Sequence, residues 1–154
     1  MKYELGESKV FMGIEVYRVV ALKSFGNVTK GDIGGWVEDE DNLSQQGNCW
    51  IFDEAMAVNR SMVAGNAEMH DYSKMLDDSM IWDHSRMYDN AQMCNNSGMY
   101  DNSKMLNNSE MHDSSEMWDN SKMSGNSKMF NNSRMYGTAE LLGNSKMRGD
   151  SIEI

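Results

Sequence analysis

Residues 99–116 read MYDNSK-MLNNSE-MHDSSE, and this six-residue pattern runs through most of the chain. Each hexad starts with a large apolar residue, carries Asp, Asn or Gly at its third position and has Ser or Ala at its fifth. The hexads follow one another from Ile51 to Ile152 without an insertion or a deletion. Internal repeats of fixed length are the sequence signature of solenoid folds, so this repeat decides the architecture.

A period of six residues does not fit a helix. A helix repeats about every 3.6 residues, so apolar residues six apart would be spread around its surface. Within a hexad the side chains instead alternate as they do in a strand. Asn and Asp tolerate the left-handed backbone conformation, so the middle of each hexad is suited to turn a corner. Three short strands and three corners close a triangular coil of about 18 residues, and stacked coils form a parallel β-helix.

A segment before the hexads, residues 34–51, reads GGWVEDEDNLSQQGNCWI. This segment and the repeats that follow resemble the YdcK-type hexapeptide-repeat proteins of enteric bacteria, phages and prophages, and the resemblance covers nearly the whole chain. Over residues 51–152 the chain is similar to left-handed β-helix proteins, which implies an all-β, left-handed parallel β-helix. Such proteins are often labelled acyltransferases because of their fold, but a fold does not establish a reaction.

Methionine occupies most of the first positions, where Ile, Val or Leu is usual. Thioether sulfurs bind copper(I), which offers one interpretation of so many methionines. Every one of them falls at the inward position, however, and Met fills irregular cores well, so we interpret them as the core and expect no metal. The twelve residues are Met69, Met75, Met87, Met93, Met99, Met105, Met111, Met117, Met123, Met129, Met135 and Met147.

The chain divides into two expected parts. Residues 1–48 lack the regular hexads and should form a small β-rich cap and a degenerate first coil, whereas residues 49–154 should form the β-helix. We expect strands at residues 2–5, 9–12 and 14–22, and a first coil that begins near residue 31. The end of a solenoid exposes unpaired backbone and apolar core, so a cap is the simplest role for this segment. Trp36 and Trp50 should pack there.

The formal net charge is −10, which is the wrong sign for binding a nucleic-acid backbone directly. The acidic residues alternate with Lys and Arg, so a solubilising surface is the simpler interpretation and mimicry of DNA the alternative. We see no signal peptide and no membrane span, and the two cysteines are not placed to pair. We therefore expect a cytoplasmic protein that does not contact a membrane.

The three histidines, His70, His84 and His112, fall at outward or corner positions. No two of them stack, none has an obvious orienting partner in a shared loop, and no loop interrupts the coils. We predict that the chain has no catalytic site and no cofactor. The alternative is a hexapeptide-repeat acyltransferase that uses an acyl-CoA donor, with His70 or His112 as general base.

Four aromatic residues recur every 18 residues and should lie on one face: Trp82, Tyr100, Trp118 and Tyr136. Charged residues are sparse in the neighbouring outward column. Exposed aromatic patches with little charge mark interfaces, and Trp and Tyr carry much of the binding energy there. We predict an interface, with a homo-oligomer as the first occupant and a host protein as the second. The alternative is a ladder of rings that only stabilises neighbouring coils.

One corner column holds Asp83, Asp101 and Asp119. Stacked carboxylates about 5 Å apart could attract a hard cation such as Ca²⁺. Alternatively, each Asp forms its turn and faces water.

Together these features predict a non-catalytic interaction or scaffold protein. The resemblance adds a phage or prophage origin, and one hypothesis is a product that binds and blocks a host defence protein.

Overall fold

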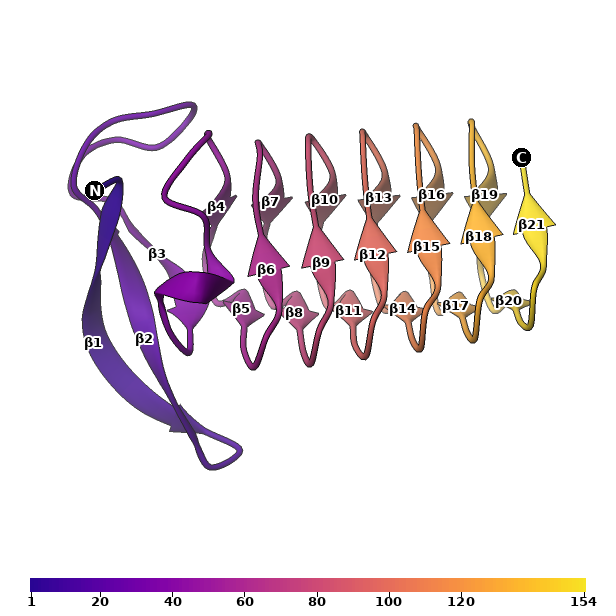
Figure 1. Cartoon of the computed structure of the whole chain (residues 1–154), viewed down its shortest axis with the longest axis horizontal. Helices are drawn as coiled ribbons and strands as arrows, with labels where there is room; N and C mark the ends of the chain where they lie inside the picture. Colours follow the sequence, from indigo (N-terminus) through magenta and orange to yellow (C-terminus); the bar gives the residue numbers. More distant parts are fainter.

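The hexads, together with the first coil that precedes them, form a left-handed parallel β-helix of about seven turns (Figure 1). The computed structural model describes all 154 residues, Met1–Ile154. It contains strands and one short 3-10 helix, η1 (Glu40–Asn42), so the predicted all-β fold is confirmed. The chain contains no helix with the length and hydropathy needed to cross a membrane.

Each side of the helix is a parallel sheet of two-residue strands. The first sheet, called here the lysine face, contains β4 (Trp50–Ile51), β7 (Glu68–Met69), β10 (Arg86–Met87), β13 (Lys104–Met105), β16 (Lys122–Met123) and β19 (Glu140–Leu141). The second, the cap face, contains β5 (Met56–Ala57), β8 (Lys74–Met75), β11 (Gln92–Met93), β14 (Glu110–Met111), β17 (Lys128–Met129) and β20 (Lys146–Met147). The third, the aromatic face, contains β6 (Met62–Val63), β9 (Met80–Ile81), β12 (Gly98–Met99), β15 (Glu116–Met117), β18 (Arg134–Met135) and β21 (Ile152–Glu153).

The register is the one that the repeat predicts. Met87 pairs with Met69 on one side and with Met105 on the other, eighteen residues away in each direction. All twelve first-position methionines are buried, and eleven of them have no exposed surface. The Ser and Ala residues at the fifth position are inward-facing too, as at Ser103 and Ala91. Core packing therefore accounts for the methionines.

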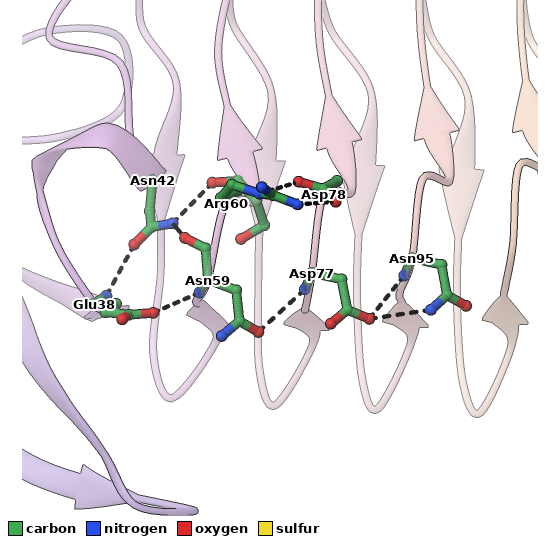
Figure 2. A network of polar contacts seen from close by, with 8 residues as sticks. Glu38, Asn42, Asn59, Arg60, Asp77, Asp78 and Asn95 are labelled. Carbon is green, nitrogen blue, oxygen red and sulfur yellow. Dashed lines mark hydrogen bonds and ion pairs between the residues drawn. The ribbon is translucent and has the colours of Figure 1, made fainter.

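The corners depend on the third residue of each hexad. Twelve Asp and Asn residues have a positive φ of 54 to 59° there, and Gly takes the remaining hexads. These side chains also join the coils, because most of them accept a hydrogen bond from the backbone nitrogen one coil further on. Figure 2 shows one such column, in which Asn59 Oδ1 accepts from Asp77 N at 3.2 Å and Asp77 Oδ2 from Asn95 N at 3.0 Å.

An antiparallel hairpin covers the N-terminal end of the solenoid (Figure 1). It consists of β1 (Tyr3–Phe11) and β2 (Ile14–Ala21), and β2 pairs with β3 (Ile33–Val37). The two expected strands at residues 2–5 and 9–12 are a single strand, β1, whose register shifts between Leu5 and Ser8.

The first coil is longer than the hexad rule predicts. Val37 pairs with Ala57 and Leu43 with Val63, a spacing of twenty residues, whereas Ile51 pairs with Met69 at eighteen.

Buried polar and aromatic residues hold the cap to the first coil. Trp36 and Trp50 are buried, as expected. The fully buried Asn42 donates from Nδ2 to the carbonyl oxygens of Asn59 and Ser61 and accepts from Glu38 N (Figure 2). Both the oxygen and the nitrogen of this buried amide therefore have hydrogen-bond partners.

Candidate functional site

The four predicted interface residues lie on one face of the solenoid. Each directly follows a strand of the aromatic face: Trp82 follows β9, Tyr100 follows β12, Trp118 follows β15 and Tyr136 follows β18. The pairing of β9, β12, β15 and β18 places the four side chains in one column with one ring per coil. Trp82 is 40% exposed and the other three are half-buried.

The column is only partly a ladder of stacked rings. Tyr100 and Trp118 stack with ring centroids 4.0 Å apart and planes inclined by 20°. Tyr100 also leans over Gly98, where a Cβ atom would lie 2.6 Å from the tyrosine oxygen. Trp82 and Tyr136 make no ring stack, so these two rings contribute little to joining the coils and remain available to a partner.

Charge is confined to one part of the aromatic face. Glu116 accepts a hydrogen bond from Trp118 Nε1 at 3.2 Å and forms an ion pair with Arg134 Nε at 3.1 Å. Burial, and secondarily the charge of Glu116, raises the pKa of Tyr100. These two charges therefore pair with each other, and the other charges next to the aromatic column are the corner carboxylates Asp83, Asp101 and Asp119.

Two hollows flank the cap-proximal end of this face. One, of about 400 Å³, is lined by Met62 and Met80 together with polar residues of the first two coils. The other, of about 220 Å³, lies on the opposite side of the column and is lined in part by Ala64 and Trp82. The aromatic face therefore has depressions at one end, and its aromatic column continues away from them.

His70 has an orienting partner that the sequence analysis missed. Its Nε2 lies 3.1 Å from Glu68 Oε2, which also forms an ion pair with Arg86. The ring is sandwiched between Phe52 and Tyr88, with centroid distances of 4.5 and 4.9 Å. The sequence predicts no obvious orienting partner in a shared loop, but the partner comes from the strand: Glu68 and His70 flank the inward Met69, so both point outward and lie side by side. His70 itself lines no hollow, but its partners Phe52 and Glu68 line a hollow of about 210 Å³ at the cap end of the lysine face.

His112 lies in a similar but larger cluster. Its Nε2 contacts Glu110 Oε2 at 2.9 Å, its Nδ1 lies 2.9 Å from Cys94 Sγ, and Lys128 Nζ donates to the same glutamate at 2.8 Å. Burial raises the pKa of Glu110, but the hydrogen bonds from Lys128 and His112 outweigh it and hold that pKa below its ordinary value. Cys94 and His112 follow strands paired in register, so an 18-residue alignment of the sequence contains the signal for this contact.

The Cys94 thiol is held in its protonated form. Burial, followed by the charges of Asp77, Glu110 and Asp113, raises its pKa to about 11. A cysteine nucleophile reacts as its thiolate, so this cluster lacks the activation that such chemistry needs. Cys94 and His112 line no hollow themselves, but Phe130, which stacks on His112 with ring centroids 5.1 Å apart, lines a hollow of about 220 Å³.

His84 is the histidine that lines a hollow. It borders two neighbouring ones on the lysine face, and its Nε2 lies 3.2 Å from Asn66 Nδ2. No carboxylate contacts this ring, and its side-chain partner is the Asn66 amide.

No family model matches the chain. A protein of Escherichia coli (strain K12) named "Uncharacterized acetyltransferase YdcK" is 38% identical over 53 residues. The aligned segment makes up 34% of this chain and 16% of that protein. This similarity and the stacked coils of the structure are both consistent with a β-helix built from six-residue repeats. The chain is a hexapeptide-repeat β-helix protein.

The corner aspartates of this hexapeptide-repeat protein serve its backbone. Asp101 Oδ2 accepts from Asp119 N at 3.1 Å, and Asp119 Oδ2 accepts from Gly137 N at 2.9 Å. Nowhere in the chain do three or more His, Cys, Asp or Glu side chains gather in a group that could hold a metal ion. The turn-forming interpretation of Asp83, Asp101 and Asp119 therefore explains the column better than a cation site.

Proposed function

We propose that this hexapeptide-repeat protein is a non-catalytic interaction protein whose aromatic face binds a second copy of the chain. The observation that carries the proposal is the column of Trp82, Tyr100, Trp118 and Tyr136, with one ring per coil and few charges in the neighbouring outward column of the strands. Trp and Tyr supply most of the binding energy at interfaces. Monomeric proteins seldom leave such a patch uncovered.

The arrangement of the face supports a symmetric dimer. Most soluble oligomers are homo-oligomers, and a two-fold interface uses the same patch on both copies. With the two-fold axis perpendicular to the solenoid axis, the two faces run antiparallel. The hollows beside Met62, Met80 and Trp82 of one copy then lie opposite the Tyr136 end of the other. One patch thus offers both depressions and side chains to fill them.

A host protein is the second occupant in this proposal. In that case the chain is a phage- or prophage-encoded product that binds and blocks a host defence protein in the cytoplasm. The support is the resemblance to YdcK-type proteins, which occur in phages and prophages, together with the net charge of −10. Affinity capture from a host lysate followed by mass spectrometry would identify such a partner.

The oligomeric mass tests the proposal. In the double variant Trp82→Ser and Tyr136→Ser, light scattering should show the mass of a monomer, because hot-spot residues contribute roughly 2 kcal/mol or more each. Neither residue takes part in a ring stack, so the far-UV spectrum should stay unchanged. The control is Tyr72→Ser with Leu142→Ser, which removes two exposed apolar side chains, 62 and 46% exposed, from outside the face. A wild-type chain that stays monomeric at high concentration and captures no host protein through this face contradicts the proposal.

An acyltransferase is the second candidate function, because the E. coli relative carries the name of an acetyltransferase. It would use an acyl-CoA donor and His70 or His112 as general base. Calorimetry with acetyl-CoA tests it directly. We expect no saturable binding, and we expect the triple variant His70→Gln, His84→Gln and His112→Gln to keep its oligomeric mass. Micromolar binding of acetyl-CoA that the triple variant loses would favour the enzyme.

A further inference from the structure

A polar groove runs along the lysine face and the corner that joins this face to the aromatic face. It consists of two hollows, of about 210 and 520 Å³, which share His84 and Arg86. The smaller hollow reaches the cap loop at Gly26–Val28, and the larger one ends at Glu140. The groove therefore follows the solenoid axis across successive coils.

The floor of the groove carries a row of three cations, of which the fold leaves two unpaired. Arg86, Lys104 and Lys122 occupy the same position on β10, β13 and β16, so each lies directly beside the next. Neither Lys104 nor Lys122 forms an ion pair. Like charges directly opposed on neighbouring strands destabilise a sheet. In a chain with a net charge of −10, this pair is not explained by solubility.

The corner beside these cations carries unused amides. Asn102 and Asn120 line the larger hollow, and their side chains make no hydrogen bond within the chain. The next corner differs, because Asn108 there accepts from Asn90 and donates to Asn126, at 3.3 and 3.2 Å. The same residue type at the same position of the hexad is thus paired at Asn108 and open at Asn102 and Asn120. The open amides face the groove.

We propose that this groove binds a linear acidic oligosaccharide through its carboxylate and hydroxyl groups. The lysines and Arg86 supply charge for carboxylates, and the amides both donate to and accept from hydroxyls. Glu140 lies beside Lys122 at one end of the cation row, forms no ion pair and can accept a hydrogen bond from a sugar hydroxyl, whereas a phosphate chain offers acceptors alone. No apolar residue lines the larger hollow, which disfavours an acyl chain or a nucleobase. The coil spacing of about 4.8 Å repeats the donors along a chain-like ligand.

Calorimetry with a hexagalacturonate probe tests the site. The wild-type chain should bind it saturably, more weakly as salt increases, and should not bind a neutral hexasaccharide. The variants Lys104→Gln with Lys122→Gln and Asn102→Ala with Asn120→Ala should each weaken binding at least tenfold. All four side chains point outward, so far-UV spectra should not change.

The matched control is Lys128→Gln with Lys146→Gln on the cap face. These lysines also lie in register, but Lys128 pairs with Glu110 and neither residue lines a hollow. An equal loss of binding in the control would mean attraction by net charge alone and would overturn the proposal. So would the absence of hexagalacturonate binding at millimolar concentration, or saturable binding of inorganic polyphosphate in its place. The site does not depend on the aromatic face, so the dimer proposal and this one fail separately.

Discussion

Asp113 Oδ2 accepts a hydrogen bond from the backbone nitrogen of Asn131, one coil further along, at 2.9 Å. The same relationship recurs at most corners, so the side chain that permits the left-handed turn also joins two coils. These bonds add to the strand ladders, in which each coil contributes only two residues per side.

Replacements at Asp113 should separate the two roles of a corner residue. Asp113→Ala loses the hydrogen bond to the next coil. It also places alanine at φ 56°, where it lacks the polar side chain that helps Asp to adopt this conformation, so we expect the free energy of unfolding to fall by roughly 2 kcal/mol. Asp113→Gly loses only the bond and should cost less, and Asp113→Asn should be nearly neutral. Denaturant unfolding of the three variants measures the order. Equal losses for Ala and Gly would show that the backbone conformation contributes nothing.

The regularity of the hexads explains why the fold was predictable. Every inward position and every corner follows from one six-residue period. Because seventeen repeats share it without an insertion or a deletion, there is one consistent assignment of inward and outward residues. The length of the first coil was not predicted, because Leu43 and Ile51, which occupy successive inward positions, are eight residues apart. A six-residue period counted backwards from Cys49 does not detect this longer step. Cys49 consequently lies beside Ala67, at the fifth position of the hexad, which Ser or Ala occupies elsewhere.

The candidate site was predictable by column but not by contact. Alignment at 18 residues places Trp82, Tyr100, Trp118 and Tyr136 together, yet only Tyr100 and Trp118 stack, because the ring of Tyr100 leans into the space left by Gly98. The sequence also does not reveal which polar residues are buried by segments far away in the chain. Lys2 is almost fully buried and donates to Cys49 O at 3.0 Å, and burial lowers its pKa.

The core should be stabilised by removing a hydroxyl. Ser109 Oγ is fully buried and has no hydrogen-bond partner, and Ala occupies the equivalent position of other hexads, as at Ala91. An unpaired buried hydroxyl costs on the order of 1 kcal/mol or more, so Ser109→Ala should raise the free energy of unfolding by about that amount. The control is Ser133→Ala, because Ser133 Oγ donates to Phe130 O at 2.9 Å. A gain of the same size in the control would disprove the explanation.

Stability should fall at alkaline pH through Cys94. Burial and nearby carboxylates raise the folded-state pKa of this thiol from its ordinary value of 9.0 to about 11, so the folded chain holds the proton more tightly than the unfolded one. The resulting stabilisation is complete below pH 9 and is lost as the pH rises through 11. Between pH 7.5 and 10.5 the wild-type chain should lose roughly 1 kcal/mol more than Cys94→Ser, after allowance for solvent screening. Parallel pH profiles would show that the thiol titrates normally.

Gly98→Ala tests whether the shape of the aromatic face matters for binding. The new Cβ would collide with the outer end of the Tyr100 ring, at 2.6 to 2.8 Å, and that ring is free to swing outward. Loss of the stack with Trp118 lowers the free energy of unfolding by roughly 1 kcal/mol, and the replacement of glycine by alanine in a strand raises it by a similar amount. The melting temperature should therefore change little, while the near-UV spectrum changes and the dimer dissociates at concentrations at least tenfold higher than in the wild type. Ser124→Ala on the lysine face is the control and should keep the wild-type dimer. A Gly98→Ala chain that moves Tyr100 yet keeps its full self-association would remove Tyr100 from the interface and confine binding to Trp82 and Tyr136.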